Sequence, residues 1–172
     1  MTLVKLTTVA VLALALGACQ SVFQPNMRKP LEVKREAWEH LKPGCSASDC
    51  PLVNIDTLHF PAQPQLDGVV ERGLLQLARD GEGAPPPASL KAYEESFLRS
   101  AESRHSTYLQ AKVREQHDGL VIVELSSYLD TGGAHGNPGR AFINWSRQQE
   151  KVLTLQDMLV PVSYTHLRAH ET

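Results

Sequence analysis

The sequence predicts an α+β domain in which an antiparallel sheet packs against two helices. Hydrophobic and polar residues alternate over residues 52–60 and again over residues 107–114, which is the period of a β-strand. Between these segments the hydrophobic spacing changes to that of a helix, over residues 66–78 and residues 90–101. Helices enclosed by strands of a short meander favour an α+β fold.

Two strands are expected before the helices. Residues 31–38 alternate irregularly, with Leu31 and Val33 as their apolar positions. Residues 52–60 alternate regularly and are followed by Pro61, which cannot continue a ladder of hydrogen bonds. Both segments are therefore predicted to be strands.

The two helices have clear limits in the sequence. The first should end at Asp80-Gly81, a pair that favours a turn. The second should begin at Ser89, whose hydroxyl can cap the first turn. The apolar face of the second helix is predicted to contain Leu90, Tyr93, Phe97 and Ala101.

The meander follows the second helix. The strand over residues 107–114 is followed by His117-Asp118-Gly119, a hairpin signal. Residues 120–125 form the most apolar strand, as expected for a central one. A third strand is expected over residues 141–146, and a helix begins within residues 155–159.

The N-terminus has the pattern of a secretory signal. A charged start leads into an apolar run over residues 6–16, which is too short to span a bilayer permanently. The run ends in Leu16-Gly17-Ala18-Cys19, which resembles the lipobox of bacterial lipoproteins. That resemblance implies a signal peptide over residues 1–18, lipidation of Cys19 and a tether over residues 19–30. The alternative is an ordinary signal peptide in which the cysteine occurs by chance.

The anchor and the composition predict where the chain resides. Gln20 follows the cysteine, and the absence of aspartate there implies the periplasmic face of the Gram-negative outer membrane. We expect the N-terminal lipid to be the membrane contact, because no second apolar run could cross a bilayer. A net charge of −2 without a basic stripe argues against nucleic acid as a partner.

The other two cysteines, Cys45 and Cys50, are predicted to form a disulfide. An exported chain with two cysteines besides the lipidated one favours this pairing. The bridge would pin a turn between two extended segments. A metal site would need more ligands than this pair and Asp49 provide, so no metal or other cofactor is expected.

The last residues do not resemble natural protein. Residues 162–172 can be back-translated into a transposase mosaic end joined to a sequencing adapter. The alternative is a natural polar tail. On the adapter interpretation, the coding sequence is known only to about Val160, and the domain over residues 31–161 lacks its C-terminal part.

A glycine-rich segment over residues 128–139 is the candidate for function. One interpretation makes His135 a base, oriented by Asp130, with Thr131 as a hydrogen-bond donor. The other is that the glycines permit a tight crossover and that His135 only holds the loop together. No nucleophile with an evident base is present, and a lone histidine does not hold a metal. The sequence therefore favours a non-catalytic loop.

This segment carries a family resemblance. Thr131-Gly-Gly-Ala-His-Gly136 after a strand, then Asn144 on the next strand, then residues 153–159, resembles the extracytoplasmic domain of RsiV-type proteins. That domain of unknown function also occurs in the peptidoglycan deacetylase PdaC. RsiV is an anti-sigma factor whose outer domain binds lysozyme. We do not expect anti-sigma activity here, because the residues before Cys19 read as a signal peptide and not as a sigma-binding segment.

The resemblance implies a binding module for a lysozyme-type muramidase or for peptidoglycan, and not an enzyme. The alternative is an envelope hydrolase that uses His135 and Asp130. Trp145 is a further surface candidate, although core packing is the expectation for it. The predicted ligand-binding residues are Tyr128, Thr131, His135 and Asn137.

Overall fold

A computed structural model describes residues 29–79, 85–117 and 119–159. The predicted signal peptide, Cys19, most of the tether, the helix stop at Asp80-Gly81 and the tail over residues 162–172 lie outside the described residues. Six strands form one sheet in the order β1-β2-β3-β4-β5-β6. The strands are β1 (Lys34–Leu41), β2 (Leu52–His59), β3 (Ser106–His117), β4 (Leu120–Asp130), β5 (Asn137–Ser146) and β6 (Lys151–Val152).

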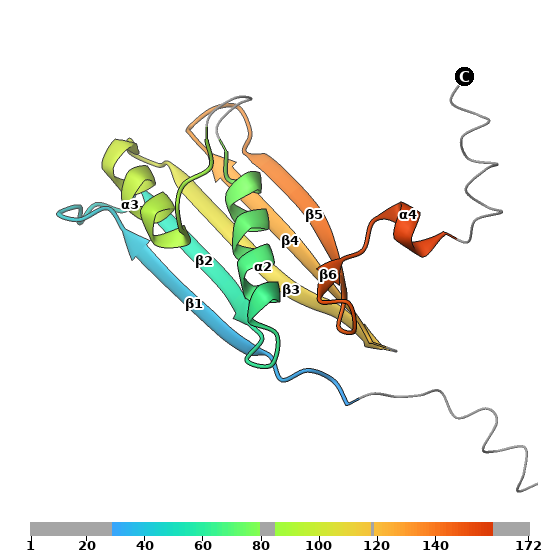
Figure 1. The fold of residues 1–172 in the computed structure, drawn as a ribbon. Coiled ribbons are helices and arrows are strands. Elements are labelled where there is room, and N and C mark those ends of the chain that lie inside the picture. The colour runs from blue at the N-terminus through green and yellow to red at the C-terminus, as the bar shows by residue number, and fades with distance from the viewer. Residues whose placement is uncertain (1–28, 80–84, 118, 160–172) are drawn as a thin grey trace, which may run out of the picture.

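The predicted α+β class is confirmed, and the sheet is antiparallel except for one pair. β1 and β2 form a hairpin, and β3, β4, β5 and β6 form a meander (Figure 1). β2 and β3 pair in parallel, with Asn54 opposite Tyr108 and Asp56 opposite Gln110. The alternation in the sequence does not predict this parallel pair. Parallel strands need a long crossover, and here the helical segment between the two strands provides it.

The helices α2 (Pro64–Leu77) and α3 (Leu90–Ser100) both lie on one face of the sheet (Figure 1). The predicted cap of α3 is confirmed, because the Ser89 hydroxyl accepts a hydrogen bond from the Ala92 amide at 3.1 Å. A short third helix, α4 (Leu155–Met158), begins with a capping box between Thr154 and Asp157. None of the helices in the described ranges could span a lipid bilayer.

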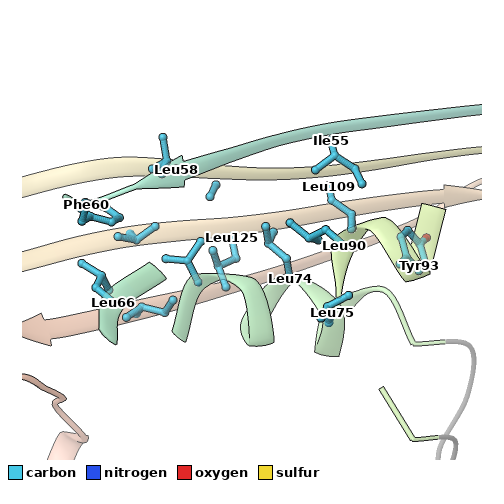
Figure 2. Close-up of a cluster of buried hydrophobic side chains, with 14 of the residues drawn as sticks. Ile55, Leu58, Phe60, Leu66, Leu74, Leu75, Leu90, Tyr93, Leu109 and Leu125 are labelled. Atoms are coloured by element: carbon cyan, nitrogen blue, oxygen red, sulfur yellow. The ribbon is translucent and has the colours of Figure 1, made fainter. Parts of the chain in front are cut away.

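The core lies between the sheet and the two helices α2 and α3, of which α3 contributes Leu90 and Tyr93 (Figure 2). Every second side chain of a strand points into this core, and this explains the alternation of apolar and polar residues in the sequence. A Cβ at Gly73 would overlap the Leu125 side chain, so this glycine lets α2 approach β4 closely. The fully buried large side chains are Val53, Ile55, Phe60, Leu66, Val70, Leu74, Leu109, Val121, Val123, Leu125 and Trp145.

Several predicted strand limits are wrong, and two of them have a clear physical reason. β1 begins at Lys34 rather than at residue 31, because the Leu31 amide bonds the Gln116 side chain instead of a ladder partner. The glycine-rich loop is also shorter than predicted, because Tyr128 of β4 still pairs with Pro138 of β5. Among the described residues β6 covers β5 only at its end, so Pro138 lies in a part of β5 that no further strand covers, where proline is tolerated.

The predicted disulfide is present. Cys45 and Cys50 are bonded within the connection between β1 and β2. The turn is also held from outside, because the Arg104 amide donates to the Asp49 carbonyl at 2.7 Å. The disulfide closes the turn, and the hydrogen bond from Arg104 joins the turn to the segment that enters β3.

Candidate functional site

The face of the sheet opposite α2 and α3, here called the open face, carries the candidate site. Because side chains alternate along a strand, the neighbours of the core residues point to this side. Among the described residues, no helix packs on it (Figure 1). Strand register aligns two rows across it: Asn54, Tyr108, Tyr128 and Pro138 in the first row, and Asp56, Gln110, Ser126 and Arg140 in the second.

A groove of about 610 Å³ lies over these rows, and we call it the tyrosine groove. Tyr108 and Tyr128 pair edge to face in it, with ring centroids 6.1 Å apart. Each tyrosine is 39% exposed, so a substantial aromatic surface remains open to a ligand. The other side chains that line the groove include Asn54, Gln110, Ser126, Pro138 and Arg140.

The glycine-rich loop supports Tyr128. A Cβ at Gly136 would overlap the Tyr128 ring, so the ring lies directly against the backbone of this glycine. Gly132 is the loop glycine with a positive φ, 77°, and its amide donates to the Asp130 carboxylate at 2.8 Å. The loop therefore holds one wall of the groove, through contacts that its glycines permit.

Two carboxylates are buried beneath the open face. Asp56 accepts two hydrogen bonds from the Arg35 guanidinium, at 2.6 and 3.0 Å, and one from Gln110 at 2.7 Å. These bonds, that from Arg35 first, hold the pKa of Asp56 below its ordinary value, against the opposing effect of burial. Asp56 therefore stays ionised.

Glu124 repeats this arrangement farther across the sheet. It accepts a hydrogen bond from Arg114 at 2.6 Å, and Arg140 lies 3.4 Å from its other oxygen. The bond from Arg114 is the main cause that lowers the pKa of Glu124. Both carboxylates thus position exposed cations at the surface, and one of these, Arg140, lines the tyrosine groove.

The predicted binding residues are only partly brought together. Tyr128 lines the groove, whereas Thr131, His135 and Asn137 are exposed in or beside the loop and do not line it. Trp145 is 2% exposed and its indole donates to Gln63, so it belongs to the core, as expected.

The pair proposed for hydrolysis is not formed in the described residues. The Asp130 carboxylate accepts the Gly132 amide, while His135 Nδ1 lies 3.3 Å from the Gly136 carbonyl. No hydrogen bond or ion pair joins the two side chains within the described part of the chain.

Most residues that line the tyrosine groove were not among the predicted binding residues, although the sequence placed two of them on the polar side of a strand. The alternation over residues 107–114 already placed Gln110 on the polar side of its strand, and the same alternation places Tyr108 there. Asn54, Ser126 and Arg140 join them only through strand pairing, above all through the unexpected parallel pair.

A second groove, of about 550 Å³, lies on the helix side beside β1 and β2. His59 Nε2 lies 2.5 Å from Glu36 Oε2, and His59 Nδ1 lies 3.4 Å from Asp67 Oδ2. The hydrogen bond with Glu36, and after it the one with Asp67, raises the pKa of His59, whereas burial acts in the opposite direction. The acidic residues of this acidic groove are Glu36, Asp67, Glu71, Glu94 and Glu95. Nowhere in the described ranges do three or more potential ligands gather as a metal site would require.

The chain is similar to solved DUF3298 proteins, whose domain has no known function. One from Pseudomonas aeruginosa PAO1 is 68% identical, with a TM-score of 0.74, and the match covers 77% of this chain. The chain spans 59% of the length of that protein. The predicted resemblance to proteins with a domain of unknown function is thus confirmed. The resemblance to RsiV in particular stays a prediction.

A second DUF3298 structure, from Bacteroides fragilis NCTC 9343, shares the fold. It is 17% identical, with a TM-score of 0.57, and the match covers 75% of this chain and 62% of the other. No protein-family model and no curated protein matches the chain.

Proposed function

We propose that the chain belongs to the DUF3298 family, is a lipid-anchored binding module of the Gram-negative envelope, and binds the glycan strand of peptidoglycan without cleaving it. The observation that carries this proposal is the exposed pair Tyr108 and Tyr128 in a groove with amide, hydroxyl and guanidinium side chains. A concave site with aromatic walls and few polar groups is typical of ligand recognition.

The chemistry of the tyrosine groove suits a sugar. A pyranose ring has an apolar face of C–H groups, which packs on an exposed aromatic ring, and a rim of polar substituents. Gln110 donates through its amide nitrogen to Asp56, so its oxygen is left to accept from a hydroxyl or an N-acetyl group. Ser126 and Arg140 add donors in the same row.

The test is calorimetry of the full chain with N-acetylglucosamine oligomers and with purified glycan strands. Tyr108→Ala and Tyr128→Ala should each weaken binding about tenfold, as expected for aromatic residues at the centre of a site. Phe142→Ala is the matched control, because Phe142 is exposed at 56% on the same face outside the groove. Absence of glycan binding, or unchanged binding by both tyrosine variants, would contradict the proposal.

A lysozyme-type muramidase is the second candidate partner. The acidic groove favours it, because its carboxylates would attract a cationic protein surface. In a titration with lysozyme, Glu95→Lys should weaken this complex and Tyr128→Ala should not. The reverse pattern would place the muramidase on the open face, and an absence of binding would leave the glycan as the partner.

The hydrolase alternative has its own test. We expect no release of soluble fragments when peptidoglycan is incubated with the full chain, since Asp130 bonds Gly132 rather than His135. Turnover by the wild type that His135→Ala abolishes, with glycan binding retained, would make the protein an enzyme.

The lipid anchor is tested separately. Cells that express the chain should incorporate labelled palmitate into it, and the label should fractionate with the outer membrane. Cys19→Ala should remove the label, because the lipobox cysteine is the predicted acceptor. Label that persists in this variant would overturn the anchor without affecting the glycan proposal.

A further inference from the structure

The open face has a regular distribution of charge across its strands. Cations and anions alternate in strand order: Arg35 on β1, Asp56 on β2, Lys112 on β3, Glu124 on β4 and Arg140 on β5. The anions are buried, at 6% exposure for Asp56 and 7% for Glu124, whereas the cations reach solvent. The surface that a ligand meets is therefore a band of positive charge.

We infer that this cationic band, Arg35, Lys112, Arg114 and Arg140, binds carboxylates of an anionic glycan, namely peptidoglycan strands that still carry their lactyl and stem-peptide carboxylates. The inference rests on the proposed glycan binding and names the substrate class of that site. It distinguishes a carboxylate-bearing strand from a neutral N-acetylglucosamine polymer.

The buried carboxylates keep the band in place. Three of the arginines are tied to Asp56 or Glu124, so their guanidinium groups are oriented before a ligand arrives. Because these side chains are already ordered, they lose less conformational entropy on binding than freely rotating exposed cations would. The Lys112 side chain forms no hydrogen bond or ion pair with another described residue, although its charge helps to lower the pKa values of Asp56 and Glu124. Its exposed ammonium can therefore contact a ligand directly.

The spacing of the band suits a repeating polymer. Neighbouring strands lie about 4.8 Å apart, so the cations on β1, β3 and β5 recur at about 10 Å across the sheet. That is about the length of a disaccharide, and in peptidoglycan every second sugar carries the carboxylate-bearing substituent. Arg140 belongs both to the band and to the tyrosine groove, so one strand could contact both.

Apart from the buried Asp56 and Glu124, the carboxylates of the open face lie toward its margins. Glu39 on β1 accepts a hydrogen bond from Asn54, and Glu115 follows the irregularity that ends the regular register of β3. On the opposite side of the sheet the acidic groove is lined by Glu36, Glu71 and Glu94. An anionic strand is therefore directed to the centre of the open face and away from the helix side.

The experiment compares two ligands of equal length: a neutral N-acetylglucosamine oligomer and a glycan strand with intact stem peptides. The full chain should bind the carboxylate-bearing strand more tightly, and only this binding should weaken as salt rises. Lys112→Glu should reduce it about fivefold or more and leave the neutral oligomer unaffected. Lys91→Glu, an exposed lysine of α3 beside the acidic groove, is the matched control and should change neither.

Each outcome separates the two proposals. If both ligands bind equally and Lys112→Glu changes neither, the cationic band is overturned while glycan binding stands. If neither ligand binds, the proposed function fails, and the band fails with it. If vesicles containing phosphatidylglycerol bind and both glycans do not, the band recognises lipid phosphate, which overturns the assignment to carboxylates.

Discussion

At the scale of single residues, Gly136 connects the glycine-rich loop to the tyrosine groove. Its Cα lies so close to the Tyr128 ring that no side chain fits between them. Gly133, three residues earlier in the same loop, has open space around its Cα. The two glycines therefore differ in what an added methyl group would do, although the sequence alone makes them look equivalent.

We predict that Gly136→Ala weakens glycan binding because the added Cβ displaces the Tyr128 ring. The effect should approach that of Tyr128→Ala, and thermal stability should change little because the loop is exposed. Gly133→Ala should bind like the wild type. Equal binding by all three proteins would show that the position of the Tyr128 ring does not matter.

His59 should make stability depend on pH. Glu36 and Asp67 raise its pKa in the folded state, so the stabilisation is complete below the unfolded value of about 6.5 and is lost as pH rises through the folded value. The free energy of unfolding, measured by urea titration, should therefore fall as pH rises above about 6.5. His59→Gln should remove this fall, and His135→Gln in the exposed loop should keep it.

At the scale of elements, the strands and helices could be predicted far better than their arrangement. β2 and α2 each bury one face against the core, so apolar residues recur along the sequence with the period of a strand or of a helix. This period can be found from the sequence alone. The parallel pairing of β2 with β3 cannot, because it depends on contacts between segments far apart in the chain. Tyr128 could be nominated from its glycine-rich neighbours, but Asn54 could reach the groove only through this pairing.

The disulfide acts on the β1–β2 connection. Cys45 and Cys50 close a short loop, so the bridge removes little entropy from the unfolded chain, about 2 kcal/mol. Replacing both residues with serine should lower the free energy of unfolding by about this amount. Urea denaturation measures it, and reduction of the wild type should reproduce the effect. A loss near zero would mean that backbone bonds such as Arg104 to Asp49 already hold the turn.

At the scale of the whole molecule, the ionisation of two carboxylates on the open face contributes to the free energy of unfolding. Asp56 on β2 holds Arg35 of β1, and Glu124 on β4 holds Arg114 of β3 and Arg140 of β5. Because the pKa of each is lowered in the folded state, both stabilise the protein above their unfolded pKa values of about 4. This stabilisation is lost as pH falls below that value through the lower folded pKa.

Acid unfolding tests this arrangement. The wild type should lose stability steeply below about pH 4, and the double variant Asp56→Asn, Glu124→Gln should have a flatter acid limb, although it starts from lower stability at pH 7. Glu95→Gln, at an exposed position of α3, should leave the acid limb unchanged. Identical acid limbs in all three proteins would exclude these two carboxylates as its cause.

We predict that the parallel pair between β2 and β3 forms last when the molecule folds. The β1–β2 hairpin and the β3–β4–β5 meander each form from local contacts, whereas the bond between Asp56 and Gln110 joins residues 54 positions apart. Pairings across such a separation close late, because the loop entropy is lost before any contact compensates for it. Tyr108 and Tyr128 therefore meet early, Asn54 arrives last, and recovery of ligand binding should follow the slowest phase of refolding.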